Sequence, residues 1–420
     1  MKKEAVLVAA LAAVLVPGPV SAAPVDPALD PAVPAPVLVP PVSDTDGPTV
    51  AQAAVLKPAW SMTGDFPVGH PLYFAGSIYH GAMGIGGADQ VGLIRRDATT
   101  GRQRTFTLPV RGSAVASPVT DGDSVFTLTS GGDAGVLHAY HPDGATRWTA
   151  TLPGENHADW VLAAGGLVLA ASEYECGRYE GDTCERTVLH AFRADTGRRV
   201  WTRKLTGGSP IATAAGGRIA VRTWQDRDEL HGDDIIEPGQ DPAPVVDDSP
   251  ALVTVLTVGN RKLWQRAVPG GSDLAADAHA VAVTGDRLCA YRATDGKQLW
   301  CAPKAHRYHG LAAGDGRFYT GRDDAKIPDD HRLAAFDART GKRLWTAQGA
   351  RPYGGITSGN GVVWLVSNTD MPVSQLLALR ATDGRELRRL PLGEYGGGTV
   401  ALGLNRAFVF SGGGAVAAFG

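Results

Sequence analysis

The sequence is poor in the residues and motifs that most often carry chemistry. It has 4 cysteines and 11 histidines among 420 residues, and it contains neither a Gly-x-Ser-x-Gly nor a His-Glu-x-x-His pattern. These absences exclude serine hydrolases with a nucleophile elbow and zinc proteases of the kind that these motifs mark. No catalytic residue is predicted.

Charge and long apolar runs are also scarce. The formal net charge is −3, so the chain lacks the basic field that nucleic-acid-binding proteins use, and no nucleic acid is expected as a partner. No segment after the N-terminal region is long and apolar enough for a transmembrane anchor.

The N-terminal residues 1–23 are typical of a secretory signal. Lys2 and Lys3 precede an apolar run at 5–16, and the small residues up to Ala22 predict cleavage after Ala22 or Ala23. No cysteine follows, so a lipid anchor is not expected. Residues 24–54, rich in proline and alanine, are expected to form a disordered or extended tether. A secreted or extracytoplasmic location follows from this reading.

Glycine, by contrast, is abundant, with 54 residues, and much of it belongs to one recurring cassette. Copies recur at intervals of roughly 36 to 63 residues, which indicates supersecondary units stacked side by side. The cleanest copy, at 335–345, reads AFDARTGKRLW. The other copies lie at 95–105, 139–148, 191–201, 256–264, 290–300 and 378–388.

Each cassette predicts a β-hairpin. An apolar strand enters a turn of Asp, Thr and Gly, where Gly supplies the positive φ that such turns need, and a second strand with a Trp leaves it. The small Ala of the first strand leaves room for a bulky neighbour. The Trp residues are therefore expected to pack between adjacent repeats and not to bind a ligand.

This pattern resembles the PQQ-like β-propeller repeat over about residues 55–420. That repeat occurs in quinoprotein alcohol dehydrogenases and in BamB, a propeller lipoprotein of the outer-membrane assembly machinery. The resemblance implies an all-β fold. We predict an eight-bladed β-propeller of four-stranded antiparallel blades, with seven blades and loose ends as the alternative.

The two chain ends are predicted to form one split blade. Residues 397–419 read as three inner strands and residues 55–62 as the outer strand, so that closure of the ring removes exposed sheet edges. A closed ring of this kind is expected to be a monomer.

The four cysteines predict two local disulfides in an oxidising compartment. Cys289 and Cys301 lie symmetrically about the turn at Asp295 and should face each other across paired strands. Cys176 and Cys184 bracket a short hydrophilic loop. A metal pair is the less favoured alternative, because there is no Cys-x-x-Cys spacing.

Long insertions are predicted on one face of the ring, where binding sites usually occur on a rigid scaffold. They lie at 172–186, 225–250, 321–331 and 367–374. The longest is acidic and includes Asp226, Asp228, Asp233 and Asp234. Its carboxylates are a candidate calcium site, although a solvated acidic loop is the simpler interpretation.

A second recurring pattern stands at the blade-to-blade connections. Its aromatic and imidazole side chains are candidates for ligand binding at the mouth of a central channel, and packing of the strand entry is the alternative. The residues concerned are His157, Tyr308, His309, Tyr353 and Tyr395.

Three functions fit the repeat. The first is a non-catalytic scaffold or ligand-binding module that needs no cofactor and binds an extracytoplasmic protein or small ligand. The second is a dehydrogenase using PQQ and calcium. The resemblance implies an adjacent Cys-Cys pair over the cofactor in that class, and no two cysteines are adjacent here. The third is an extracytoplasmic ligand sensor.

Overall fold

The computed structural model describes most of the chain beyond residue 46. The described residues are 47–63, 66–83, 90–111, 114–130, 134–153, 156–176, 184–224, 250–271, 273–285, 287–303, 306–324, 331–370, 373–393, 398–411 and 415–420. They belong to one compact unit, residues 37–420. Residues 1–23, with the predicted signal, lie outside the described part.

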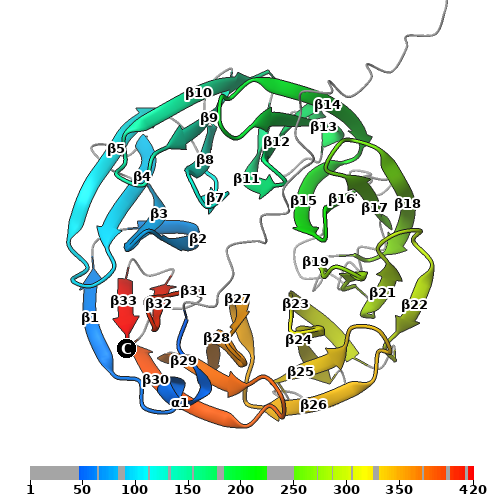
Figure 1. Ribbon diagram of the computed structural model, residues 1–420. Helices are drawn as coiled ribbons and strands as arrows, with labels where there is room; N and C mark the ends of the chain where they lie inside the picture. The colour runs from blue at the N-terminus through cyan, green and yellow to red at the C-terminus, as the bar shows by residue number, and fades with distance from the viewer. Residues whose placement is uncertain are drawn as a thin grey trace, which may run out of the picture. The chain divides into compact units, whose positions relative to one another are not determined.

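The described strands form eight four-stranded antiparallel blades around a ring (Figure 1). Blades 1 to 7 run from an innermost strand to an outermost strand in chain order. Each innermost strand contacts those of the two neighbouring blades. Blade 2 has its innermost strand divided into two short segments.

The strands of blades 1 to 4 have these bounds: β2 Phe66–Phe74, β3 Ser77–Met83, β4 Gln90–Asp97 and β5 Gln103–Arg111; β6 Ala114–Val115, β7 Val119–Thr120, β8 Val125–Ser130, β9 Gly135–Tyr140 and β10 Thr146–Leu152; β11 Asn156–Ala164, β12 Leu167–Cys176, β13 Cys184–Arg193 and β14 Arg199–Thr206; β15 Gly208–Ala215, β16 Arg218–Trp224, β17 Pro250–Thr257 and β18 Lys262–Pro269.

Blades 5 to 7 follow with these bounds: β19 Leu274–Ala276, β20 Ala280–Val283, β21 Cys289–Arg292 and β22 Gln298–Cys301; β23 His306–Gly314, β24 Arg317–Asp324, β25 His331–Asp337 and β26 Arg343–Gln348; β27 Pro352–Gly359, β28 Val362–Asp370, β29 Val373–Arg380 and β30 Glu386–Gly393.

Blade 8 is built from both ends of the chain, which confirms the predicted split blade. Its three inner strands are β31 (Gly398–Gly403), β32 (Arg406–Ser411) and β33 (Ala415–Phe419), and its outer strand is β1 (Pro58–Thr63). Trp60 of β1 pairs with Ala418 of β33. Val416 and Ala418 are fully buried, so the last strand is part of the core.

Trp side chains join neighbouring blades, as the cassette predicts. Trp300 lies opposite Ala290 within blade 5, and its indole Nε1 donates to the carbonyl of Ala338 in the next blade at 3.0 Å. Its ring lies against Gly341, the positive-φ residue of that blade's turn. We call this arrangement the tryptophan contact. It recurs with Nε1–oxygen distances of 2.8–3.2 Å at Trp60, Trp148, Trp201, Trp264 and Trp345.

The interface between blades 1 and 2 uses other side chains. The hydroxyl of Tyr79 donates to the carbonyl of Pro142 at 2.6 Å, and Arg95 Nη1 donates to the carbonyl of Asp143 at 2.8 Å. Tyr79 is 1% exposed, so a buried aromatic side chain again reaches the neighbouring turn.

The folded region begins earlier than residue 55, the boundary that the sequence suggested. Residues at the end of the predicted tether form helix α1 (Val50–Ala53), which Thr49 and Gln52 close with a reciprocal capping box. Ala53 and Leu56 are buried in a cluster with Trp364 of blade 7. The tether prediction was wrong for these last residues, because their apolar side chains cover the interface between blades 7 and 8.

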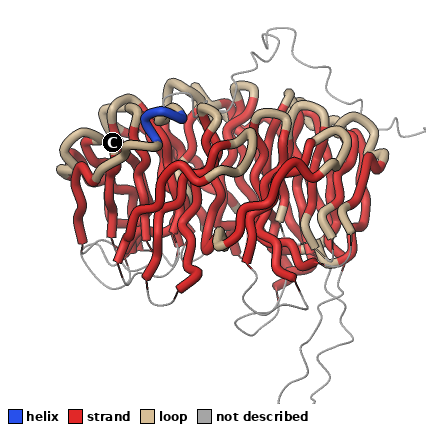
Figure 2. The backbone as a smooth tube through the Cα atoms, turned by 90° about the horizontal axis from the view of Figure 1, so that it is seen from below, coloured by secondary structure: helices blue, strands red, loops and turns tan. Residues whose placement is uncertain are grey.

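The two faces of the ring differ in their connections (Figure 2). One face carries the connections between second and third strands and those between blades, and we call it the long-loop face. The opposite, short-turn face carries tight turns such as Gly165-Gly166, together with α1. All four predicted insertions join second and third strands, and the strand ends that they join lie at the long-loop face as expected. Residues 177–183, 225–249, 325–330 and 371–372 of these insertions lie outside the described part of the chain. Within the described residues, no helix has the length and apolarity to cross a membrane.

Candidate binding face

The innermost strands surround the centre of the ring (Figure 1). In five of them, β2, β11, β15, β23 and β27, the pairing with the second strand is irregular near the start of the strand, on the long-loop face. The register shifts between Val68 and Leu72 in β2, between Gly208 and Ile211 in β15, and between His309 and Leu311 in β23. Such bulges leave a backbone N–H outside the sheet ladder and redirect side chains. At these bulged strand starts, a backbone N–H therefore needs a hydrogen-bond partner from outside its own sheet.

Side chains of adjacent blades provide that partner. The N–H of His70 in blade 1 donates to Ser117 Oγ of blade 2 at 2.7 Å. The N–H of Ser209 in blade 4 donates to the carboxylate of Glu173 in blade 3. These contacts satisfy backbone donors that would otherwise lack a partner and fix the spacing of neighbouring blades around the ring centre.

Asp273 makes the most extensive of these contacts. Its Oδ2 accepts from Thr284 Oγ1 at 3.0 Å and from the N–H of Gly310, in the next blade, at 2.9 Å. Gly310 has φ +60°, a value that favours glycine. The carboxylate therefore connects blades 5 and 6 at the long-loop face.

A buried guanidinium stands next to this carboxylate. Arg222 is 3% exposed, donates from Nη1 to the carbonyl of Gly271 at 3.3 Å and lies 4.7 Å over the ring of Trp224. Burial lowers the pKa of Arg222 to about 10, and the charge of Asp273 acts in the opposite direction. Arg222 remains protonated at neutral pH, so its positive charge is a permanent electrostatic feature of this region.

The candidate residues at the strand entries have different surroundings. Tyr308 is 5% exposed and packs edge-on against Phe336 at 6.1 Å, and burial raises its pKa. Its ring therefore belongs to the core between blades. His157, His309 and Tyr353 lie on innermost strands β11, β23 and β27, but their side chains are outside the described part of the chain.

The glycines of this second pattern are required by close contacts. Gly354 has φ +136°, and an added Cβ would lie 2.1 Å from the carbonyl oxygen of Gly398 in blade 8. At Gly355 an added Cβ would lie 2.6 Å from the ring of His70 in blade 1. The pattern thus includes backbone positions that hold blades 7, 8 and 1 together.

The acidic candidates for calcium belong to the longest predicted insertion. Asp226, Asp228, Asp233 and Asp234 lie outside the described residues, as does Tyr395. Within the described ranges, no three His, Cys, Asp or Glu side chains gather as a metal site would require.

One predicted disulfide is present. Cys289 and Cys301 are register partners on β21 and β22 and form a disulfide, which confirms that pairing. Cys176 and Cys184 are register partners on β12 and β13, while their side chains are outside the described part. The bond between Cys289 and Cys301 joins the two outer strands of blade 5, away from the innermost strands. It therefore does not fit the cysteine pair that the resemblance implies over a PQQ cofactor.

Comparison with known proteins supports the repeat and the fold. The family model described as outer membrane protein assembly factor BamB matches residues 251–420, which confirms the resemblance to the PQQ-like repeat there. No curated protein matches the chain.

Three solved structures illustrate the likeness. Quinohemoprotein alcohol dehydrogenase from Comamonas testosteroni is 15% identical with a TM-score of 0.59, over 88% of this chain and 77% of that one. BamB from Moraxella catarrhalis is 14% identical with a TM-score of 0.56, over 87% and 99%. Saccharomyces cerevisiae Sqt1 is 8% identical with a TM-score of 0.56, over 87% and 97%. At these identities the likeness establishes a propeller fold and does not choose among functions.

Sequence reasoning missed the residues that connect the strand entries. Ser117, Glu173 and Asp273 belong to no cassette, and their partners are backbone N–H groups of neighbouring blades. A signal existed only at Asp273, an acidic residue directly before an apolar strand.

Proposed function

We propose that this chain is a secreted, non-catalytic propeller that binds a partner protein or ligand with its long-loop face. The observation that carries the proposal is the unequal distribution of loops. The insertions at 172–186, 225–250, 321–331 and 367–374 all join second and third strands, whereas the short-turn face consists of tight turns.

The construction of the ring supports a role in presenting these loops. Tryptophan contacts and the contacts of Ser117, Glu173 and Asp273 hold the blades to one another on both faces. Long loops on a rigid scaffold can bind a partner without a large loss of scaffold entropy on association.

Secretion is part of the proposal. It is supported by the signal pattern of residues 1–23 and by a disulfide, which persists in oxidising compartments. The N-terminal residue of the exported protein, determined by mass spectrometry, should be Ala23 or Pro24. An intact Met1 on exported protein would contradict this part.

The competing enzyme function is supported by the fold shared with quinohemoprotein alcohol dehydrogenase. It is tested by titrating the mature protein with PQQ and calcium and assaying dye-linked oxidation of alcohols and aldose sugars. Saturable PQQ binding with turnover would overturn the non-catalytic proposal. Binding of a sugar or other small ligand without turnover would favour the ligand sensor.

The binding face is tested by site-specific photocrosslinking on intact cells. A photoreactive residue replaces Thr206, exposed near the long-loop face, or Arg339, exposed in a turn of the short-turn face. We expect a discrete crosslinked species from position 206 and none from position 339. The reverse pattern, or equal labelling from both, would contradict the assignment of the binding face.

A further inference from the structure

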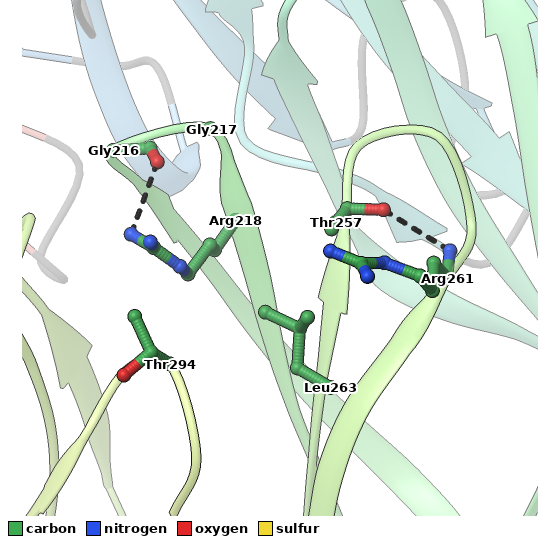
Figure 3. Close-up of a pocket in the computed structure, with 7 residues that line it drawn as sticks. All are labelled: Gly216, Gly217, Arg218, Thr257, Arg261, Leu263 and Thr294. Carbon is green, nitrogen blue, oxygen red and sulfur yellow. Dashed lines mark hydrogen bonds between the residues drawn. The ribbon is translucent and has the colours of Figure 1, made fainter.

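A small pocket opens on the short-turn face between blades 4 and 5 (Figure 3). Its volume is about 240 Å³. Residues at three turns line it. These are the turns between β15 and β16 and between β17 and β18 in blade 4, and the turn between β21 and β22 in blade 5. The lining residues are Gly216, Gly217, Arg218, Thr257, Arg261, Leu263 and Thr294. The pocket is remote from the long-loop face and independent of the proposed function.

The turn of blade 4 departs from the repeat at this place. In blades 1, 2, 3, 5, 6 and 7 the turn between third and fourth strands contains a carboxylate, whereas residues 257–261 contain none. Those carboxylates are Asp97, Asp143, Asp195, Asp295, Asp337 and Asp383. Most accept backbone N–H groups of their own turn, and several also pair with an arginine.

Blade 2 provides the closest match to the turn of blade 4. In blade 2 the N–H of His141 donates to the carbonyl of Ala145, and the N–H of Gly144 donates to the carbonyl of His141. In blade 4 the N–H of Thr257 donates to the carbonyl of Arg261, and the N–H of Asn260 donates to the carbonyl of Thr257. The third residue is Asp143 in blade 2 and Gly259 in blade 4. Gly259 does not have a positive φ, and the space around its Cβ position is open. The absence of a carboxylate here is therefore not a steric requirement.

Without that carboxylate, the pocket has a local excess of positive charge. Arg218 Nη1 donates to the carbonyls of Gly216 and Ala278, both at 3.2 Å, which holds its guanidinium between the two blades. Neither Arg218 nor Arg261 pairs with a carboxylate in the described part of the chain. Within the described residues, Nε and Nη2 of Arg218 make no hydrogen bond, and neither does the guanidinium of Arg261, whose backbone N–H donates to Thr257 Oγ1 at 3.1 Å.

The acidic groups nearest along the chain already have partners. Asp277 Oδ1 accepts from the N–H groups of His279 and Ala280 in its own turn, both at 2.7 Å. Asp295 accepts from Lys297 N and pairs with Arg292, each at 3.0 Å. Within the described residues, neither carboxylate forms an ion pair with Arg218 or Arg261.

We propose that this pocket binds a short dicarboxylate. Figure 3 shows Arg218 and Thr294 on one side, Arg261 on the other and Leu263 between them. One carboxylate would accept from Arg218 and the hydroxyl of Thr294, and the second from Arg261, while the methylene groups contact the Leu263 side chain. Guanidinium groups suit carboxylates because both are planar and paired donors match paired acceptors.

The test uses the mature protein and succinate at constant ionic strength, followed by calorimetric titration. Butyrate, with one carboxylate fewer, and inorganic phosphate are the comparison probes. R261Q removes one charge from the pocket, and K342Q removes one at the corresponding end of the blade 6 turn, where Asp337 is present. G259D supplies the carboxylate that blade 2 has in the same type of turn.

We expect saturable binding of succinate and about tenfold weaker binding of butyrate, since each charge-assisted hydrogen-bonded contact contributes about one order of magnitude. R261Q and G259D should weaken succinate binding about tenfold or more, and K342Q less than twofold. G259D should keep the unfolding midpoint of the wild type, which separates neutralised charge from misfolding.

Three results would overturn the proposal. The first is no saturable succinate binding by the wild type. The second is equal affinity for succinate, butyrate and phosphate, which would indicate unspecific attraction of anions. The third is equal loss of affinity in R261Q and K342Q, which would reflect net charge and not the pocket.

Discussion

Gly341 offers the sharpest test of the tryptophan contact. An alanine there would retain the N–H that donates to the carbonyl of Asp337 at 2.9 Å, so the turn keeps its backbone bond. Two costs are added. At φ +68° the backbone is left-handed, which costs a residue with a Cβ about 1–2 kcal/mol. The new Cβ would also lie 2.4 Å from Trp300 Cδ2.

The second cost depends on the Trp ring being held in place. Trp300 is 8% exposed, and its Nε1 is bonded to Ala338, so the ring cannot move away without losing that hydrogen bond. Overpacking of this kind costs about 1–3 kcal/mol. Gly341→Ala is thus expected to lower the free energy of unfolding by about 2–5 kcal/mol.

Gly316 provides the matched control in the same blade. It has φ +69°, and no atom lies within 4 Å of an added Cβ. Gly316→Ala should therefore cost only the backbone term, about 1–2 kcal/mol. Urea unfolding followed by circular dichroism measures both variants. In the Gly341→Ala background, Trp300→Leu should cost less than it does alone, because the overlap is removed. Equal losses for the two glycine variants, or strict additivity with Trp300→Leu, would refute the reasoning.

Three further predictions concern closure, pH and the disulfide. Deleting residues 415–420 removes β33 and its pairing with β1, so the melting temperature of the whole ring should fall; an unchanged melting curve would contradict ring closure. Burial lowers the pKa of His138 to about 4 from 6.5, so the unfolded chain takes up a proton between these values before the folded chain does. Stability should therefore be complete above about pH 6.5 and decline by about 3 kcal/mol towards pH 4. His138→Thr removes the imidazole and introduces threonine, the residue that blade 4 has at the same cassette position, Thr254. This variant should flatten the pH dependence of urea unfolding between about pH 6.5 and 4. An unaltered slope would contradict the assignment of this dependence to His138. Replacing Cys289 and Cys301 with serine should cost about 2–3 kcal/mol in the same assay and leave partner binding intact; selective loss of binding would argue against a structural role.

Ring closure was predictable because it rests on local pattern. The Trp at position 60 without a preceding strand and the terminal strand without a following one together indicate the split blade, and the structure pairs Trp60 with Ala418. Helix α1 was missed although Thr49 and Gln52 have the spacing of a capping box. Four helical residues are too few for a recognisable period, and their burial depends on blade 7, more than 300 residues away along the chain.

The candidate sites were less predictable, because they depend on contacts between blades. The cassette indicates which residues face a neighbour, as it does for Trp300, but it contains no information on bulged strand entries. Tyr308 illustrates the limit. Its place at an entry was clear from the sequence, whereas its burial in one cluster with Ala290 and Trp300 depends on the neighbouring blade 5.

The repeat also indicates where a specific function can arise. Residues such as Gly341 and Trp345 are explained by contacts between blades, and the same contacts recur around the ring. Where a blade departs from the cassette and still keeps these contacts, packing between blades does not explain the departure. Blade 4 meets this condition, because Trp264 keeps its bond to Ala293 while the turn at Gly259 lacks a carboxylate. The turn beside the two arginines is therefore a place where blade 4 differs chemically from the other repeats, because its carboxylate is missing.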